Sequence, residues 1–260
     1  MRPDVLPTPE RISIELTNKC GKKCPFCYNK SHPDGAVAWA FDELLHFVRD
    51  CAARGTKAFS FGGGEPLESD LLFPILKATQ GQFFRSLTSN GLLLDEAMIR
   101  RLVEAKPDKV HVSIHFPGLE SEVARVADRV KALEQAGIRS GINLLVARSK
   151  LAQARGVARR LADEAIGPER IIFLPQRGHD TPSPREIAEV AGKARFQSMA
   201  CLVKCGKSPR FASVGWDKQV AWCSYTVSRR AMLEINANGL MAALKDLPVT
   251  YCGGGDGSEI

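Results

Sequence analysis

RISIELTNKCGKKCPFC, residues 11–27, begins with a short run rich in β-branched residues and ends with three cysteines within eight residues. The run RISIEL (11–16) is typical of a buried strand. Cys20, Cys24 and Cys27 follow it with the spacing C-x3-C-x2-C. The stretch therefore predicts a strand that carries three thiols in the loop at its carboxyl end.

Five more runs of the same kind follow, and each is separated from the next by a helical pattern. Gly55 and Gly137 stand between a helical pattern and the next strand, as helix C-terminal caps do, and Asp95 is placed to cap a helix start. Six strands alternating with helices predict parallel strands joined by right-handed crossovers. Because six units are too few for a closed eight-stranded barrel, we expect an α/β fold, an open partial (β/α)6 barrel. The five runs are KAFSF (57–61), FFRSLTS (83–89), KVHVSI (109–114), GINLLV (141–146) and RIIFL (170–174).

The pattern changes after residue 175. A turn-rich connector precedes a helix expected over about 185–199, and RFASVGWDKQVAWC (210–223) predicts a hairpin that turns near 215–218. A last helix is expected near 230–245. We therefore divide the chain into a barrel over residues 1–180 and a small cysteine-containing appendage over residues 181–260.

The composition is that of a globular protein, with 44% hydrophobic and 25% charged residues. No apolar run approaches the roughly 20 residues that span a bilayer, and the first ten residues lack the apolar core of a signal peptide. We therefore expect a cytoplasmic protein without a membrane partner, whose thiols stay reduced. The net charge of +7 favours anionic partners. However, the basic residues of 148–160 are interleaved with alanines, which argues against nucleic acid.

Clustered cysteines in a reducing compartment indicate metal binding rather than disulfides. Three thiolates on one loop can hold three irons of a four-iron cluster, which ordinarily takes four cysteines. The fourth iron then remains open to a small molecule. A zinc site is the alternative, although zinc prefers four ligands and C-x2-C pairs. The lone Cys51 falls on an apolar helix face and is expected in the core.

CGKKCPFC resembles the signature of the radical S-adenosylmethionine (SAM) enzymes, in which C-x3-C-x2-C follows the first strand of a partial (β/α)6 barrel. Phe26 matches the aromatic residue that precedes the third cysteine. The resemblance implies that Cys20, Cys24 and Cys27 hold a [4Fe-4S] cluster whose remaining iron is chelated by SAM. It also implies that reductive cleavage of SAM yields a 5′-deoxyadenosyl radical, which abstracts hydrogen from a substrate.

The resemblance extends to residues that would contact SAM. FGGGEPL (61–67) is similar to the family's GGE motif, and TSNG (88–91) to its T-N-G. VSIHFPG (112–118) matches the strand end that holds the ribose, with His115 in place of the usual Asp. A plain turn for the glycines, a structural His115 and an internal hydrogen bond for Asn143 remain alternatives. The implied SAM contacts are Phe26, Gly63, Gly64, Glu65, Ser89, Asn90, Ser113, His115 and Asn143.

A second group of cysteines lies outside the barrel, and four thiols suggest a closed four-ligand site for iron–sulfur or zinc. DKQVAWC (217–223) resembles the hairpin of the SPASM or twitch appendage, although Lys218 and Trp222 replace its Gly and Pro. The resemblance implies an auxiliary [4Fe-4S] cluster, with structural zinc as the alternative. The expected ligands are Cys201, Cys205, Cys223 and Cys252.

The resemblance implies a radical SAM enzyme. Three hypotheses about the function of the chain remain open, two of them enzymatic and one not. The first is modification of a peptide side chain, by crosslinking or oxidation of a ribosomally made peptide. Because only about ten residues precede the first strand, a separate peptide-recognition protein is then expected. The second is a small-molecule or nucleotide-derived substrate. The third is a non-enzymatic zinc- or nucleic-acid-binding module. Either enzyme would need a reductase, flavodoxin or ferredoxin as electron donor.

Overall fold

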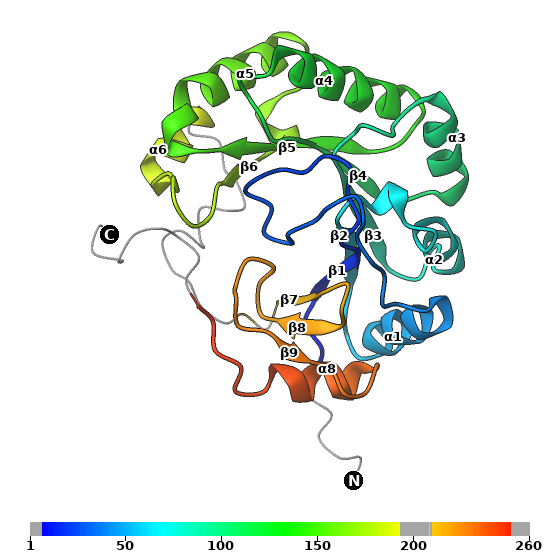
Figure 1. The fold of residues 1–260 in the computed structure, drawn as a ribbon. Coiled ribbons are helices and arrows are strands. Elements are labelled where there is room, and N and C mark those ends of the chain that lie inside the picture. Colours follow the sequence, from blue (N-terminus) through cyan, green and yellow to red (C-terminus); the bar gives the residue numbers. More distant parts are fainter. Residues whose placement is uncertain (1–6, 193–207, 209, 251–260) are drawn as a thin grey trace. The chain divides into compact units, whose positions relative to one another are not determined.

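The computed structural model describes residues 7–192, 208 and 210–250, and Figure 1 shows its ribbon. The described residues fall into two compact units. The first unit takes those within Met1–Thr88, Arg101–Asp108 and Lys207–Thr250, and the second takes those within Ser89–Arg100 and Lys109–Gly206. The domain boundary between residues 180 and 181 stays a prediction, while residues 210–250 belong to the same unit as the first two strands.

The elements follow the predicted alternation of strands and helices. The strands are β1 (Arg11–Thr17), β2 (Ala58–Gly63), β3 (Phe84–Ser89), β4 (Lys109–Ile114), β5 (Ser140–Val146), β6 (Ile171–Pro175), β7 (Phe211–Val214), β8 (Gln219–Ala221) and β9 (Arg230–Ala231). The α-helices are α1 (Phe41–Ala53), α2 (Leu72–Ala78), α3 (Glu96–Ala105), α4 (Glu120–Gln135), α5 (Leu151–Asp163), α6 (Pro184–Val190) and α8 (Ala237–Leu244). Short 3-10 turns are η1 (Pro66–Glu68), η2 (Arg148–Lys150) and η3 (Pro168–Arg170).

In the first unit the strand order is β3-β2-β1-β7-β8-β9. The pairs β3–β2, β2–β1 and β1–β7 are parallel. The pairs β7–β8 and β8–β9 are antiparallel. The predicted hairpin is therefore confirmed, and its first strand adds to the sheet beside β1. Figure 1 shows α1 and α8 side by side in this unit, where the Ala237 N–H donates to the Asp50 carboxylate at 2.7 Å.

In the second unit β4, β5 and β6 form parallel pairs. Helix α4, which runs from Glu120 to Gln135, packs on β4 and β5 through an apolar face of the predicted spacing. Gly137 ends this helix with a φ of 77°, as its place in the sequence predicted. The buried residues of the face are Val123, Val126, Val130 and Leu133.

The C-terminal helix was predicted too long. Residues 230–231 form β9 and pair with β8, and the helix begins only at Ala237. Strand pairing therefore overrides the helical pattern of residues 230–236. Asn236 caps α8 by accepting the Gly239 N–H at 2.8 Å. The helix predicted over 185–199 is found as α6, but it ends at Val190 and Gly192 follows with a φ of 61°. Residues 193–199 lie outside the described residues.

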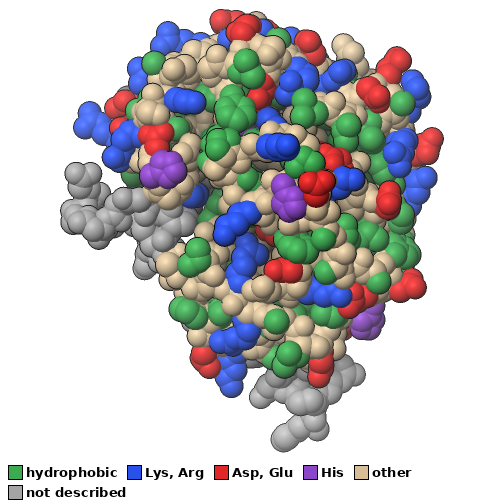
Figure 2. Space-filling view, viewed as in Figure 1, with side chains coloured by type: hydrophobic (Ala, Val, Ile, Leu, Met, Phe, Trp, Pro, Cys, Tyr) green, Lys and Arg blue, Asp and Glu red, His purple; other side chains and the backbone are tan. Residues whose placement is uncertain are grey.

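Charge is mixed on the surface. On the face drawn in Figure 2, basic and acidic side chains are interspersed. Among the described residues, no helix combines the length and apolar character needed to cross a bilayer.

Candidate functional site

The three-cysteine loop lies between β1 and α1, at the carboxyl end of β1 as predicted. Cys20, Cys24 and Cys27 are each half-buried, and no disulfide joins the described cysteines. The loop folds back on itself, because the Cys20 N–H donates to the His32 carbonyl at 2.9 Å and the Cys27 N–H donates to the Cys24 carbonyl at 3.1 Å. Partly exposed thiols on one turn are suited to holding an iron–sulfur cluster. Phe26 is half-buried in the same loop.

Two side chains at the end of β1 fix the stem of this loop, and the sequence analysis did not single them out. The Thr17 hydroxyl donates to the Ala36 carbonyl at 3.0 Å, and the Asn18 side-chain carbonyl accepts the Ala36 N–H at 2.6 Å. Thr17 Oγ1 also accepts the Lys19 N–H at 2.9 Å. Both ends of the loop are thereby tied together, which limits the movement of the cysteines.

The glycine-rich turn after β2 packs directly against this stem. A Cβ on Gly63 would lie 2.4 Å from the Thr17 carbonyl oxygen, and one on Gly64 would lie 2.0 Å from the Lys19 carbonyl oxygen. These two positions therefore require glycine because protein backbone approaches them. Gly62 differs, since a Cβ there would meet nothing within 4 Å. Gly62 therefore has open space beside it that the next two glycines lack.

Glu65 completes the turn and is fully buried. Its carboxylate accepts the Leu67 N–H at 3.2 Å, which caps η1, while its own N–H donates to the Lys19 carbonyl at 2.8 Å. The Gly64 N–H donates to the Thr17 carbonyl at 2.6 Å. The turn and the cysteine loop thus form one hydrogen-bonded assembly within the first unit.

Ser89 and Asn90, at the end of β3, are buried and shape the turn that follows. Ser89 Oγ accepts the Gly91 N–H at 3.0 Å, and Asn90 Oδ1 accepts the Leu92 N–H at 2.8 Å. Gly91 has a φ of 78°, a conformation that favours glycine. A contact between SAM and either side chain stays a prediction.

Ser113 on β4 and Asn143 on β5 are partners in the parallel register, so the structure brings these two predicted residues together. Both are buried. Asn143 Oδ1 has no hydrogen-bond partner among the described residues. Because a buried polar atom without a partner is unfavourable, this side chain fits a role in binding a ligand that carries a hydrogen-bond donor, as SAM does.

His115 follows β4 and is half-buried. The Glu122 carboxylate accepts the His115 N–H at 2.6 Å and the Phe116 N–H at 3.4 Å. Glu122 is itself buried on α4, so it fixes the β4–α4 loop from behind. The sequence analysis missed this carboxylate, which lies seven residues after His115.

A second polar assembly in the first unit surrounds Glu15 on β1. The Glu15 side chain is 2% exposed, and Arg229 Nη2 lies 3.5 Å from its Oε1. Burial raises the pKa of the Glu15 carboxyl, although Arg229 lowers it. Nearby, the rings of Tyr28 and Tyr225 meet edge to face with centroids 5.0 Å apart. The residue after Cys27 is thus joined to the loop after Cys223.

Cys223 follows β8 and is half-buried. The other expected ligands of the second site, Cys201, Cys205 and Cys252, lie outside the described residues. Within the described ranges, no group of three His, Cys, Asp or Glu side chains is arranged to hold a single metal ion.

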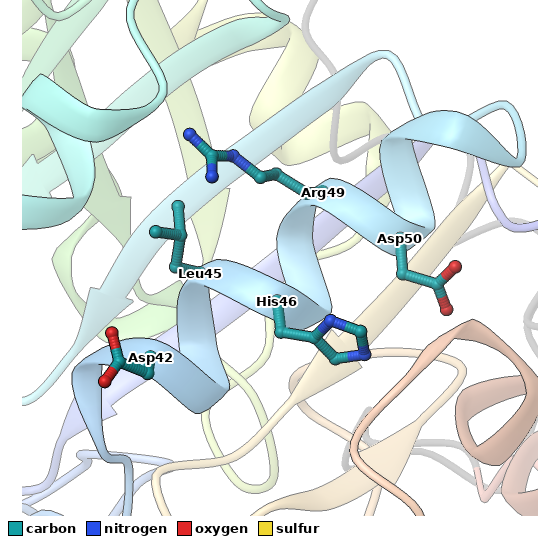
Figure 3. Close-up of a pocket in the computed structure, with 5 residues that line it drawn as sticks. All are labelled: Asp42, Leu45, His46, Arg49 and Asp50. Carbon is teal, nitrogen blue, oxygen red and sulfur yellow. The ribbon is translucent and has the colours of Figure 1, made fainter.

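Two features of α1 lie apart from these assemblies. Cys51 is fully buried, and burial raises the pKa of its thiol, so its prediction as a core residue is confirmed. Figure 3 shows a hollow along α1, lined by Asp42, Leu45, His46, Arg49 and Asp50. Two of these side chains hold other elements in place. Arg49 donates to the Ala78 carbonyl, and Asp50 accepts the Ala237 N–H at the start of α8.

Comparison with known proteins places these features in context. The model of the Radical SAM superfamily matches residues 14–146, more than half of the 260-residue chain. The match includes the cysteine loop, the glycine-rich turn and Asn143.

Two curated relatives are similar over part of the chain. PqqA peptide cyclase of Granulibacter bethesdensis is 28% identical over 171 residues, which are 58% of this chain and 46% of that protein. GTP 3′,8-cyclase of Synechococcus sp. (strain CC9605) is 29% identical over 197 residues, which are 69% of this chain and 52% of that protein. The chain therefore spans about half the length of these relatives.

Among solved structures, Streptococcus suis SuiB bound to S-adenosylmethionine superimposes with a TM-score of 0.64 at 14% identity. The match covers 84% of this chain and 59% of SuiB. SuiB has also been solved with its precursor peptide SuiA, and that structure superimposes with a TM-score of 0.56. The likeness confirms the predicted α/β class, with the open parallel sheet of a partial barrel.

Proposed function

The chain belongs to the radical SAM superfamily, and from this we propose that it is an enzyme that cleaves SAM reductively. The observation that carries the proposal is the loop of Cys20, Cys24 and Cys27 at the carboxyl end of β1, which is hydrogen-bonded to the Gly64–Glu65 turn. If bound there and reduced by an external electron donor, a [4Fe-4S] cluster would pass one electron to SAM, which would give methionine and a 5′-deoxyadenosyl radical.

The residues of this chain have distinct parts in the proposal. The three thiolates bind iron, and Thr17 and Asn18 hold their loop in place. The open space over Gly62 can admit the methionine part of SAM beside the cysteines. In the second unit, Ser113 and Asn143 supply polar atoms for binding, with Asn143 Oδ1 left to accept a donor. The other proposed contacts to SAM are Phe26, Gly63, Gly64, Glu65, Ser89, Asn90 and His115.

The test compares cysteine variants of anaerobically reconstituted protein. Cys24→Ala should lose iron and abolish 5′-deoxyadenosine formation from SAM and dithionite. Cys51→Ala is the matched control, because Cys51 is buried in α1 and should leave the iron content unchanged. Loss of iron from the control but not from Cys24→Ala would exclude this cluster site.

The second proposed group is an auxiliary [4Fe-4S] cluster held by Cys201, Cys205, Cys223 and Cys252. Support comes from the hydrogen bonds that tie the loop after Cys223 to Thr250, two residues before Cys252 in the sequence. Thr226 Oγ1 accepts the Thr250 N–H at 3.1 Å, and Ser228 Oγ lies 2.7 Å from Thr250 Oγ1.

Iron analysis tests the second site. We expect about eight irons per chain if each site holds four, and about four in Cys223→Ala with SAM cleavage retained. About four irons in both proteins would exclude the auxiliary cluster. Zinc in place of the second set of irons would favour the structural alternative.

For the substrate we propose a peptide whose side chain is oxidised or crosslinked, with a separate peptide-recognition protein and a reductase, flavodoxin or ferredoxin as partners. The similarity to PqqA peptide cyclase supports it. The similarity to GTP 3′,8-cyclase favours a second candidate, a nucleotide substrate.

Deuterium transfer separates the two candidates. The reconstituted enzyme is incubated with SAM and either GTP deuterated on its ribose or a deuterated candidate peptide. Deuterium in 5′-deoxyadenosine identifies the substrate. Transfer from neither would refute both assignments, while SAM cleavage alone would still support the family chemistry.

A further inference from the structure

A cluster of basic groups lies at the start of β4 and β5, within the second unit. Val110 pairs with Ser140 and His111 pairs with Gly141 in the parallel register. The Ser140 hydroxyl donates to the Val130 carbonyl of α4 at 3.0 Å, so Ser140 faces the helix. Because side chains alternate along a strand, Lys109 and His111 lie on the opposite face.

Arg139 joins this face from the residue before β5. Its carbonyl accepts the Val110 N–H at 2.9 Å, which sets Arg139 beside Lys109, and it is the neighbour of the helix-facing Ser140. Ser113 and Asn143 lie on the same face, two residues further along β4 and β5. The basic groups therefore lie next to the polar pair Ser113 and Asn143 on one face of β4 and β5.

The imidazole of His111 lies over Gly141. A Cβ on Gly141 would come within 2.7 Å of the Arg170 carbonyl oxygen, 3.1 Å of His111 Cδ2 and 3.2 Å of His111 Nε2. The absence of a side chain there makes room for both the carbonyl group and the ring. Nε2 is buried and has no hydrogen-bond partner among the described residues. Burial, followed by Lys109 and Arg139, lowers the pKa of His111 to about 4. The ring is therefore neutral near pH 7 and keeps one N–H to donate.

The charge of this cluster is not balanced by the described residues. Cations on the neighbouring elements have acidic partners, as Lys131 has Glu164 at 2.6 Å and Arg170 has Glu134 at 2.8 Å. Lys109 and Arg139 have no ion-pair partner in the described part of the chain. Burial and the positive charges of Arg139 and Arg170 lower the pKa of Lys109. An anion placed here would reverse that repulsion.

From this geometry we propose that Lys109, His111 and Arg139 bind a phosphate group. Two cations match the charge of a phosphate dianion, and the imidazole N–H and the guanidinium supply directional donors to its oxygens. A free phosphate ion and the phosphate of a nucleotide share this chemistry. The site needs neither the iron–sulfur cluster nor SAM, so it stands or falls separately from the proposed reaction.

Isothermal titration calorimetry of the full chain with inorganic phosphate tests the site. The titration is done first on protein without reconstituted iron–sulfur clusters and then on reconstituted protein. Lys109→Met and Arg139→Met should each weaken binding by about tenfold or more, because each removes a charged partner of the anion. Lys150→Met is the matched control, since Lys150 is an exposed lysine of the same unit, and it should bind as the wild type does. Absence of binding by the wild type, or equal binding by Lys109→Met, would overturn the proposal.

A variant that fails to fold would also lose binding. Thermal melting is therefore a second measurement, because it reports whether Lys109→Met is folded. Phosphate should raise the melting temperature of the wild type and leave that of Lys109→Met unchanged. Without phosphate, Lys109→Met should melt at or above the wild type, because like-charge repulsion is removed. A lower melting point combined with an unchanged phosphate response would refute the site. Tighter binding of GTP than of phosphate identifies a nucleotide as the source, and weaker binding identifies the free ion.

Discussion

The contact between the glycine-rich turn and the cysteine loop gives a sharp prediction for Gly64→Ala. The new Cβ would lie 2.0 Å from the Lys19 carbonyl oxygen, whereas ordinary contact begins at 3.4 Å. The two backbones must therefore separate by about 1.4 Å. The atoms that this Cβ would meet belong to the backbone of Asn18 and Lys19, which cannot turn away as a flexible side chain could.

The cost follows from this displacement. Overpacking of a buried contact costs about 1–3 kcal/mol, and the separation also stretches the hydrogen bonds from the Gly64 and Glu65 N–H groups to Thr17 and Lys19. Each such bond contributes about 1 kcal/mol. We expect Gly64→Ala to lose about 3 kcal/mol of unfolding free energy and most of its capacity to retain iron.

Urea unfolding followed by circular dichroism measures the loss, with Gly62→Ala as the matched control. A Cβ on Gly62 meets nothing within 4 Å, so this variant should unfold within about 0.5 kcal/mol of the wild type. If Gly64→Ala were as stable as Gly62→Ala, the two backbones would not be in contact and the reasoning would be wrong.

Three further predictions concern stability. Burial raises the pKa of Glu15 above its ordinary value of 4.5, so the Glu15 carboxyl keeps its proton to higher pH in the folded chain than in the unfolded chain. The free energy of unfolding therefore falls as the pH rises from the unfolded pKa of this carboxyl to its folded pKa. Relative to Glu15→Gln, the wild type should therefore lose stability as the pH rises above 4.5; urea midpoints that run parallel in the two proteins as the pH rises would contradict this. Gly156→Ala should stabilise the chain by about 0.5–1 kcal/mol in thermal melting, because Gly156 lies inside α5 with open space around it; a lower melting point would count against that geometry. Asp95→Ala should cost about 1 kcal/mol in urea unfolding, because Asp95 Oδ1 accepts the Met98 N–H at 2.8 Å at the start of α3; an unchanged midpoint would show that the cap contributes nothing.

The six βα strands could be predicted because each is a short buried run of β-branched or aromatic residues, and the glycines and Asp95 mark helix ends locally. The helix over 230–245 was predicted too long because the pairing of β9 with β8 depends on residues about ten positions away. Asn236, whose side chain caps the observed start of α8, was not singled out in the sequence.

The candidate site divides in the same way. Spacing alone identified Cys20, Cys24 and Cys27, since three thiols in eight residues are a local pattern. Thr17 and Asn18 were missed because their partner, Ala36, lies 19 and 18 residues away. Glu122 was missed because a carboxylate near a helix start looks like an ordinary surface residue until its hydrogen bonds to the β4–α4 loop are seen.

The place of β7 beside β1 has a consequence for synthesis on the ribosome. Arg11 pairs with Phe211, so one edge of β1 lacks its partner until 200 more residues have been made. At about 5–20 residues per second, this interval lasts roughly 10–40 s. During that time β1 is an unpaired edge strand, which is a template for association with other chains. The period in which this edge can pair with another chain therefore lengthens as translation slows, and it ends only when the hairpin emerges.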